Sequence, residues 1–273
     1  MRKITIITGA NSGIGFEFAR QLYGQEQSGT KEFWLIARNS EKTDESIKRI
    51  IDEFGKKEGT TLRNIPLDIS GRNGVVRFKE TLESEEENGE YGIETLVNNA
   101  GFGTYGEFAE TPLEKEIDMV DLNCASLTGI CGLCIPRMDR GSSIINVSSL
   151  AAFLPLGNFA VYAATKSYVL SFSVALAAEL KDKGISVTAL CPGSVSTNFA
   201  NVASNGARKE VLHGKSPEKV VSHCIKKARK GEKIVLWAFK WKFTAFMSRF
   251  VGRYFGARFT FLHNKRPYKH EQV

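Results

Sequence analysis

The stretch TGANSGIG (residues 8–15) lies between the apolar run KITII (residues 3–7) and an amphipathic segment that begins at Phe16. This order indicates a buried strand that runs directly into a helix, with three glycines at the turn. Glycine permits a tight turn, lets backbone approach a ligand without a Cβ in the way, and leaves the helix N-terminus free to bind an anion. The spacing differs from the commoner G-x-G-x-x-G of dinucleotide folds. The stretch nevertheless predicts a phosphate-binding turn after the first strand of an α/β sheet.

Strand-like and helix-like runs alternate along the rest of the chain. This alternation predicts an α/β fold, a Rossmann-type, doubly wound, seven-stranded parallel sheet with crossover helices. The expected strands span residues 3–8, 32–37, 61–66, 94–98, 142–148, 185–191 and 233–236. The expected helices span residues 13–24, 41–55, 71–84, 113–134, 160–182 and 216–230.

Tyr162 and Lys166 stand four residues apart at the start of a long apolar helical pattern. Residues i and i+4 lie on one face of a helix, so the phenol and the ammonium are expected side by side. A neighbouring ammonium stabilises the phenolate and so lowers the tyrosine's pKa from its usual value near ~10. The pair therefore predicts a proton-exchanging site of the kind that carbonyl reduction requires.

With these motifs in place, the chain resembles the short-chain dehydrogenase/reductases over about residues 3–236. The resemblance rests on five motifs in the family's order: TGANSGIG (8–15), NNAG (98–101), NVSS (146–149), YAATK (162–166) and PGSVST (192–197). It implies an NADP-dependent ketoreductase similar to the hydroxysteroid dehydrogenases. In that family the active serine lies thirteen residues before the tyrosine, which selects Ser149 over Ser148.

The resemblance also implies a role for each of four catalytic residues. Tyr162 is the general acid; Lys166 lowers its pKa and hydrogen-bonds the nicotinamide ribose. Ser149 donates to the substrate carbonyl oxygen, where charge develops. Asn123 anchors a water that relays protons through Lys166.

Eighteen residues are expected to bind the cofactor, of which the last four hold the nicotinamide amide. They are Gly9, Asn11, Ser12, Gly13, Ile14, Gly15, Arg38, Asn39, Asp68, Asn98, Ala100, Gly101, Tyr162, Lys166, Pro192, Gly193, Val195 and Thr197.

The end of the second strand favours NADP(H) over NAD(H). Folds that use NAD usually place an acidic residue there to bind the ribose hydroxyls. This chain has Ala37 at that position and Arg38 after it, and the planar fork of an arginine suits a phosphate. By resemblance, Asp68 contacts the adenine.

Length and composition predict one enzyme domain, residues 1–236, followed by a C-terminal extension, residues 237–273. The chain has 273 residues, 42% of them hydrophobic, without a run of 18 consecutive apolar residues. Residues 1–3 lead straight into the first strand, so we expect no signal peptide and a cytoplasmic protein. The five cysteines are expected to be free thiols.

No metal site is predicted. The C-x-x-C of Cys131 and Cys134 falls inside a helical pattern, with no second pair and no nearby histidine to complete four ligands. The four histidines, at 213, 223, 263 and 270, are scattered without ligand spacing.

Apolar residues follow the fourth and fifth strands and are expected to form the walls of a substrate site. They are Phe102, Tyr105, Phe108, Phe153, Leu154, Pro155, Leu156 and Phe159. Such walls favour a lipophilic ketone or aldehyde; packing of the core or of a dimer contact is the alternative. By resemblance, residues 196–214 form a lid over the substrate, and we expect a homodimer or homotetramer.

The chain's basic excess lies in its last part. Residues 1–225 hold 24 Lys/Arg against 28 Asp/Glu, net −4, whereas residues 226–273 hold 13 against 2, net +11. At helical spacing, residues 238–262 predict one basic amphipathic helix whose stripe contains Phe243, Phe246, Met247, Phe250 and Tyr254. Such a helix suits an anionic membrane surface, at the inner face. Packing on its own domain or on a partner subunit, where it would cover the mouth of the active site, is the equal alternative. Nucleic-acid binding is not expected, because no reading module accompanies the charge.

The sequence therefore predicts an NADP(H)-dependent oxidoreductase acting on the carbonyl or secondary alcohol of a lipophilic substrate, of hydroxysteroid or 3-oxoacyl type. One alternative is a nucleotide-sugar epimerase or dehydratase, although that branch of the family has a different glycine spacing and a larger C-terminal domain. Another is a non-catalytic NADP sensor, which would normally have lost part of the catalytic set.

Overall fold

A single parallel sheet organises the computed structural model, which describes residues 1–26, 31–209, 211 and 213–269. Its seven strands follow the order β3-β2-β1-β4-β5-β6-β7. They are β1 (Arg2–Thr8), β2 (Lys31–Ala37), β3 (Thr60–Pro66), β4 (Tyr91–Asn98), β5 (Ser143–Val147), β6 (Ser186–Leu190) and β7 (Ile234–Val235). Strands β2 and β3 are added on one side of β1, and strands β4 to β7 are added on its other side. The strand order therefore reverses between the paired neighbours β1 and β4. The predicted doubly wound, seven-stranded parallel sheet is therefore confirmed.

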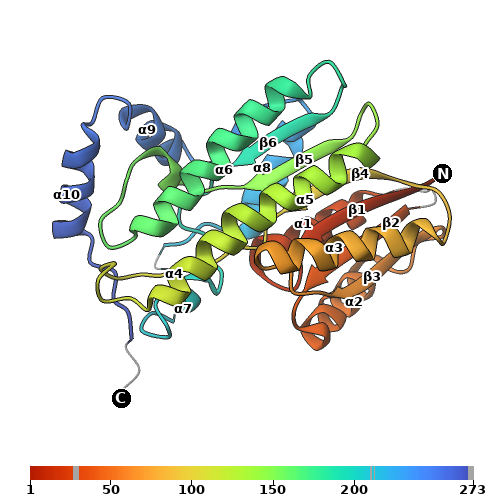
Figure 1. The fold of residues 1–273 in the computed structure, drawn as a ribbon, viewed down its shortest axis with the longest axis horizontal. Helices are drawn as coiled ribbons and strands as arrows, with labels where there is room; N and C mark the ends of the chain where they lie inside the picture. Colours follow the sequence, from red (N-terminus) through yellow and green to blue (C-terminus); the bar gives the residue numbers. More distant parts are fainter. Residues whose placement is uncertain (27–30, 210, 212, 270–273) are drawn as a thin grey trace.

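Helices cover both faces of the sheet (Figure 1). In chain order the α-helices are α1 (Gly13–Gln25), α2 (Ser40–Phe54), α3 (Gly71–Glu86), α4 (Leu113–Val120), α5 (Leu127–Cys134), α6 (Ala160–Glu179), α7 (Phe199–Ala203), α8 (Pro217–Ala228), α9 (Phe239–Met247) and α10 (Arg253–His263). Side chains of α3, α5 and α6 share one apolar core with the sheet, and side chains of α1, α2 and α8 share a second. This two-sided burial explains why the strands read as continuous apolar runs.

The expected helix at 113–134 is interrupted by a π-helical turn. Residues Asp121–Ser126 form this turn, η1, between α4 and α5. The whole stretch Leu113–Arg137 and helix α6 are long and apolar enough, by composition, to cross a membrane. Both contribute buried residues, among them Ile130 and Val169, to the core on one face of the sheet. Less than half of the most apolar window of each is buried, 39% in Leu113–Arg137 and 44% in α6, so this packing accounts for only part of their apolarity.

The C-terminal extension forms two helices where one was expected. Helix α9 ends at Met247, and α10 begins at Arg253 after Gly252. Glycine is a poor helix former, which explains the break in a stretch whose apolar spacing alone predicted a single helix over 238–262. Residues 270–273 of the extension, with His270, and residues 210 and 212 of the expected lid lie outside the described residues.

The extension packs closely on the rest of the chain, and glycines make this possible. A Cβ on Gly193 would stand 2.4 Å from the indole nitrogen of Trp241, and one on Gly157 would stand 2.4 Å from the Cβ of Phe261. The backbone N–H of Gly157 also donates to Thr260 Oγ1 at 2.9 Å. In Figure 1 the two blue helices lie at the end of the molecule toward which the strands point.

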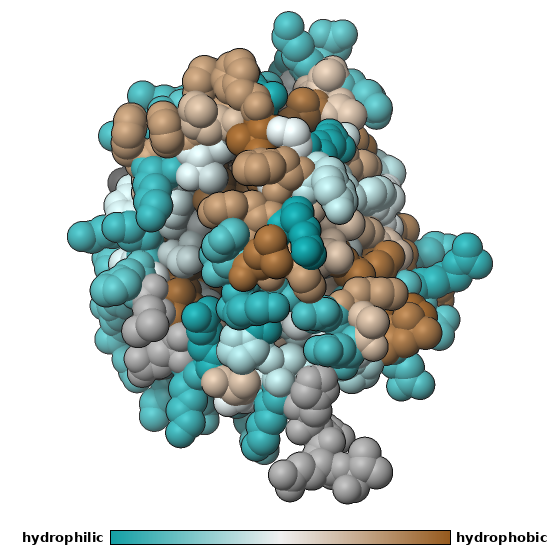
Figure 2. All heavy atoms as spheres, turned by 90° about the vertical axis from the view of Figure 1, so that its left-hand side faces the viewer, coloured by the Kyte–Doolittle hydropathy of each residue, from teal (hydrophilic) through white to brown (hydrophobic). Residues whose placement is uncertain are grey.

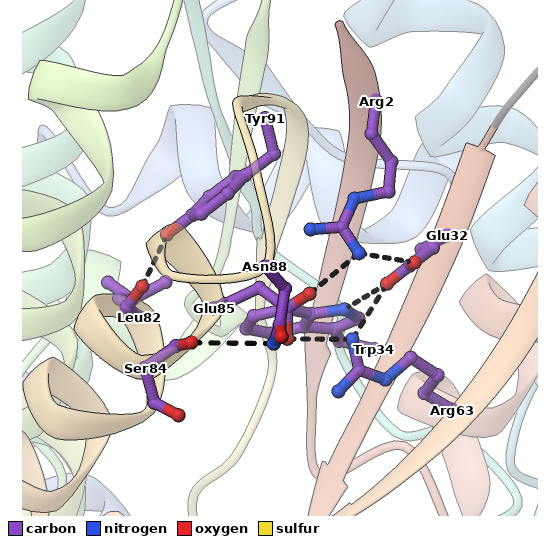
Figure 3. Close-up of polar contacts among 9 residues, drawn as sticks. All are labelled: Arg2, Glu32, Trp34, Arg63, Leu82, Ser84, Glu85, Asn88 and Tyr91. Carbon is purple, nitrogen blue, oxygen red and sulfur yellow. Dashed lines mark hydrogen bonds and ion pairs between the residues drawn. The ribbon is translucent and has the colours of Figure 1, made fainter.

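A partly buried ion-pair network fixes β1, β2, β3 and α3 together (Figure 3). Arg2 and Arg63 each pair with both Glu32 and Glu85, at N···O distances of 2.6–2.9 Å. The indole of Trp34 donates to Glu32 at 3.0 Å. Burial acts to raise the pKa of Glu32, but the hydrogen bonds from Trp34, Arg63 and Arg2 outweigh it and lower that pKa. The network is structural, because none of its residues lines the cavity described next.

Candidate active site

A cavity of about 770 Å³ opens where the central strands end. Residues that follow β1, β4, β5 and β6 line it, together with residues from the start of α6, the segment 197–211 and the C-terminal extension. In open α/β sheets, ligands bind in this position, outside the carboxyl ends of the strands at the switch point. A second cavity, of about 460 Å³, lies at the opposite ends of the strands beside Thr5 and Lys31 and contains none of the predicted site residues.

The glycine turn forms one wall of the larger cavity through Gly9, Ser12, Gly13 and Ile14. Gly9 has a positive φ of 64°, which a side chain would strain. A Cβ on Gly15 would stand 2.2 Å from the carbonyl oxygen of Gly9, so the helix can begin this close to the turn only with glycine there. Helix α1 carries no side-chain hydrogen bond at its N-cap, Ser12. The residues present therefore fit a dinucleotide, because a bare turn and an uncapped helix N-terminus suit its pyrophosphate.

Tyr162 and Ser149 meet inside the cavity through a side-chain hydrogen bond. Ser149 Oγ also accepts from the backbone N–H of Ala151 at 3.1 Å, and it donates to the Pro192 carbonyl at 3.4 Å. The neighbouring Ser148 instead donates to the backbone carbonyl of Lys166 at 2.7 Å. Of the two serines, Ser149 is therefore the one placed to act beside the tyrosine.

Burial raises the pKa of Tyr162 above its ordinary value, although the Ser149 hydrogen bond and the charge of Arg266 oppose the rise. The net shift is opposite to the lowering expected from Lys166, whose own effect on this pKa stays a prediction. The reason is that removal of the phenolate from water outweighs the nearby charges. Tyr162 is therefore protonated at neutral pH, the state from which it can give a proton.

Lys166 lies beside Tyr162 as the i, i+4 spacing predicted, with Nζ 5.7 Å from the tyrosine ring centroid. Its ammonium donates to the Val147 carbonyl at 2.9 Å. Burial lowers the pKa of Lys166 to about 8. The lysine is therefore held in place by the strand β5 that also leads to Ser149.

Asn123 lies in the π-helical turn, and its side chain is held from two sides. Its Nδ2 donates to the Phe102 carbonyl at 2.9 Å and to Thr165 Oγ1 at 3.1 Å, while its Oδ1 accepts from the Phe102 N–H at 3.2 Å. The π turn widens the helix locally at this residue, as such turns frequently do at functional sites. Asn123 therefore ties the loop after β4 to α6, just below Lys166.

Six of the predicted cofactor residues do not line the cavity: Asn11, Gly15, Arg38, Asn39, Asp68 and Asn98. Asn39 caps α2 by accepting from the Lys42 N–H at 2.8 Å. The buried amide of Asn98 donates to Asn146 Oδ1 at 3.0 Å, under the cavity floor. Arg38 is exposed at the end of β2, and its charge helps to lower the pKa of Asp68, against the effect of burial. Their roles stay predictions.

Apolar residues line the other side of the cavity. Six of the eight wall residues predicted from the sequence are among them. They are Phe102, Tyr105, Phe153, Leu154, Leu156 and Phe159. Pro155 and Phe108 lie outside the lining, and Phe108 is 56% exposed. The expected lid contributes Thr197, Phe199, Val202 and Val211.

Several lining residues were not among the site residues expected from the sequence. Asn99 holds the glycine turn by donating to the carbonyls of Thr8 and Gly9 at 3.0 and 3.2 Å. Its position inside the NNAG motif was the only available indication. Phe243 and Met247 come from the extension, as does Arg266, and Arg208 comes from the lid segment. Only the tertiary fold brings these four to the site.

Within the described part of the chain, no group of three or more His, Cys, Asp or Glu residues is arranged to hold a metal ion. The five cysteines are free thiols there, four of them buried.

The model of the short chain dehydrogenase family matches residues 3–208. Among curated relatives, the very-long-chain 3-oxoacyl-CoA reductase of Rattus norvegicus is 33% identical over 227 residues, which are 81% of this chain and 67% of that protein. The probable oxidoreductase EphD of Mycobacterium bovis is 33% identical over 208 residues, 73% of this chain but 32% of that protein. The chain thus spans about a third of the length of this relative.

Solved structures share the fold. A short-chain dehydrogenase of Sphingobium yanoikuyae in complex with NADPH has a TM-score of 0.74 at 23% identity, over 91% of this chain and 94% of that one. A short-chain dehydrogenase/reductase of Burkholderia phymatum in complex with NAD has a TM-score of 0.75 at 18% identity, over 100% and 98%.

A doubly wound sheet with a glycine turn at its switch point, and a tyrosine, lysine and serine beside it, defines a nucleotide-binding oxidoreductase. The chain belongs to the short-chain dehydrogenase family.

Proposed function

We propose that the protein is an NADP(H)-dependent ketoreductase that transfers a hydride between the nicotinamide and the carbonyl or secondary alcohol of a lipophilic substrate. The observation that carries this proposal is the single cavity in which Ser149, Tyr162 and Lys166 face both the glycine turn and an apolar wall. The bound cofactor would supply or accept the hydride. A substrate of hydroxysteroid or 3-oxoacyl type would suit the aromatic wall.

Each residue of the site has a role in this chemistry. Tyr162, which is protonated across the neutral range, gives its hydroxyl proton to the carbonyl oxygen. Ser149 donates a hydrogen bond to the same oxygen as negative charge develops there. Lys166 lies within reach of both the tyrosine and the glycine-lined side of the cavity. Asn123, on the far side of Thr165, fixes the helix that carries both groups.

The choice of NADP(H) over NAD(H) rests on Arg38, exposed at the end of β2 where an acidic residue would favour NAD. The relatives support a nicotinamide cofactor without deciding between the two, since their structures contain NADPH in one case and NAD in another.

An assay of cofactor absorbance tests the proposed function. The protein is mixed with NADPH or NADH and a panel of lipophilic ketones, and with NADP⁺ or NAD⁺ and the matching alcohols. Ketone-dependent oxidation of NADPH is expected. An epimerase or dehydratase would instead return the hydride and leave the absorbance unchanged while altering its substrate, and a sensor would bind NADPH with no turnover of either kind.

The C-terminal extension presents an aromatic face, which we define as its exposed rings. These are Phe239, Phe243, Phe246, Phe250, Tyr254, Phe255 and Phe259, each at least 50% exposed. Figure 2 shows apolar residues gathered on this side of the molecule with hydrophilic ones around them. Most of the face is not packed on its own domain, because only Trp241 and Ala245 of α9 are buried, although Phe243 also lines the cavity. In this proposal the protein is cytoplasmic, and the aromatic face contacts either an anionic membrane surface or a second copy of the chain. Either contact would explain why the rings of the face are exposed.

A further inference from the structure

Arg266, although it lies beyond the last helix, lines the same cavity as Tyr162. Its Cζ stands 4.9 Å from the ring centroid of Phe159 and 5.9 Å from that of Tyr105. Its Nη1 donates to the Gly157 carbonyl at 3.2 Å. Because Phe159 stacks directly on Tyr162, one aromatic ring separates the guanidinium from the phenol.

The charge of Arg266 is only partly compensated by the protein. Among the described residues, its one side-chain hydrogen bond is that to Gly157, and no carboxylate stands within ion-pair distance. Burial lowers the pKa of Arg266, and the charge of Arg208 adds to this, while Tyr105 and Tyr162 act in the opposite direction. A guanidinium has five N–H donors and keeps its charge in proteins. A half-buried one therefore gains from an anion that enters the cavity.

Arg208 brings a second guanidinium to the same cavity from the lid segment. Two cations close enough to affect each other repel, and this repulsion is relieved when a negative group lies between them. Arginine is well matched to this task, because its planar fork binds carboxylates and phosphates through two parallel hydrogen bonds.

We propose that Arg266, together with Arg208, binds an oxyanion of the substrate, so that the substrate is an oxo acid or an oxoacyl thioester rather than a neutral ketone. The inference rests on the proposed reductase function and narrows its substrate class. The apolar body of such a substrate lies along Phe159 and its neighbours, its carbonyl meets Tyr162, and its acidic group meets the arginines. Through Arg266, the C-terminal extension would help to determine which substrates the site accepts.

The test uses a series of oxodecanoic acids whose ketone lies at successive distances from the carboxylate. Each acid is compared with its methyl ester and its coenzyme A thioester. Each is assayed with NADPH and the full-length protein. The variants are Arg266→Gln, which removes the charge, Arg266→Lys, which keeps it, and Arg258→Gln as a control. Arg258 is an exposed arginine of the same extension that does not line the cavity.

The anionic substrates should be preferred over the esters. In Arg266→Gln, kcat/KM for the preferred anion should fall by about 10- to 150-fold, mainly through KM, which is the range for a hydrogen bond to a charged group. The esters should change little, Arg266→Lys should recover part of the loss, and Arg258→Gln should match the parent. Preference for the free acid indicates a carboxylate, and preference for the thioester indicates the phosphates of the carrier.

Two results would overturn the inference. One is no preference for anions; the other is an equal loss of kcat/KM on acid and ester, which would mean that Arg266 acts through Tyr162 or through packing.

If no ketone of any form is turned over, the proposed function fails instead. Binding then decides the inference alone, through the fluorescence of the three tryptophans, of which Trp241 lies against Gly193 of the cavity lining. Decanoate should bind more tightly than decanol to the parent, and this difference should disappear in Arg266→Gln; the same affinity for both probes would refute the site. Melting temperatures of the variants check that they are folded.

Discussion

The ring of Tyr162 stacks on the ring of Phe159, with centroids 4.1 Å apart and planes inclined by 19°. Phe159 is the N-cap residue of α6, and both rings are buried. The stacking fixes the direction of the phenol from an apolar side, and the hydrogen bond with Ser149 fixes it from a polar side. The hydroxyl is therefore preorganised, and its removal should affect the chemistry without disturbing the surrounding fold.

Tyr162→Phe should lower turnover by about 10² to 10⁴-fold, the usual contribution of a general acid. NADPH affinity should stay close to that of the parent, because only the hydroxyl is removed. Tyr168→Phe is the matched control, since Tyr168 lies on the same helix with its hydroxyl bonded to Thr128 on the outside. Turnover and NADPH titration are measured on both, and a Tyr162→Phe protein as active as the control would remove Tyr162 from the mechanism.

Arg38→Ala should weaken NADPH binding by about 1.5–3 kcal/mol, the range for a hydrogen bond to a charged group, and leave NADH nearly unchanged. The reason is that only NADPH carries the extra phosphate. Arg229→Ala is the control, because this exposed arginine lies by the cavity at the opposite ends of the strands. Titration of both cofactors decides the matter; an equal loss for the two would show that Arg38 does not bind the phosphate.

Alkaline pH should destabilise the protein through its four buried thiols. Burial raises the pKa of Cys131 and of Cys191 to about 12, and it raises the pKa values of Cys134 and Cys224 as well. Thiols of the unfolded chain ionise near pH ~9, while the buried thiols of the folded chain keep their protons. The folded state therefore keeps its full stability below about pH 9 and loses stability as the pH rises toward ~12.

The free energy of unfolding should fall by up to roughly 1.4 kcal/mol per pH unit for each buried thiol. The single Lys166, whose pKa is lowered, acts in the opposite direction between about 8 and its ordinary value of 10.5. Urea unfolding under reducing conditions at successive pH values measures the slope. Cys224→Ala should reduce it by the share of one thiol. A free energy of unfolding that does not fall above pH ~9 would contradict the burial of these groups.

The aromatic face should bind anionic vesicles at low salt and release them as salt rises, because charge attraction is screened over about 10 Å at 0.1 M. Phe250 and Tyr254 are 70% and 83% exposed, so replacing both by serine should abolish sedimentation with vesicles at little cost in stability. Phe108→Ser, a change at an exposed ring outside the extension, is the control. If the parent ignores vesicles and the double variant changes from dimer to monomer, the face is a subunit interface.

Much of the fold was predictable because the signals are local. Buried parallel strands appear as continuous apolar runs, and glycine-rich turns mark where they end, so all seven strands were placed within a few residues. The i, i+4 rule placed Tyr162 and Lys166 together for the same reason. The break at Gly252 was missed because the apolar spacing continues through it, although glycine's poor helix propensity gave a weak indication.

What the sequence could not predict depends on contacts between distant residues. Nothing in the spacing of residues near 266 indicates that a guanidinium would reach Phe159 from beyond the last helix. The net direction of the Tyr162 pKa shift could not be predicted, because the cost of burying a phenolate depends on how completely the fold excludes water. A helical pattern alone also gives no indication of the π turn at Asn123, since it differs from an α-helix by one residue in its hydrogen bonding.

The contact between Trp241 and Gly193 also makes the pocket depend on distant parts of the chain. The glycine turn comes from residues 9–15, whereas Phe243, Met247 and Arg266 of the same cavity come from the extension. Because a domain generally folds as a unit, the complete pocket can form only after residue 266 has been synthesised. A chain cut short after β7 would keep the sequence of its cofactor turn and lack one wall of the pocket, so truncation should cost substrate selectivity.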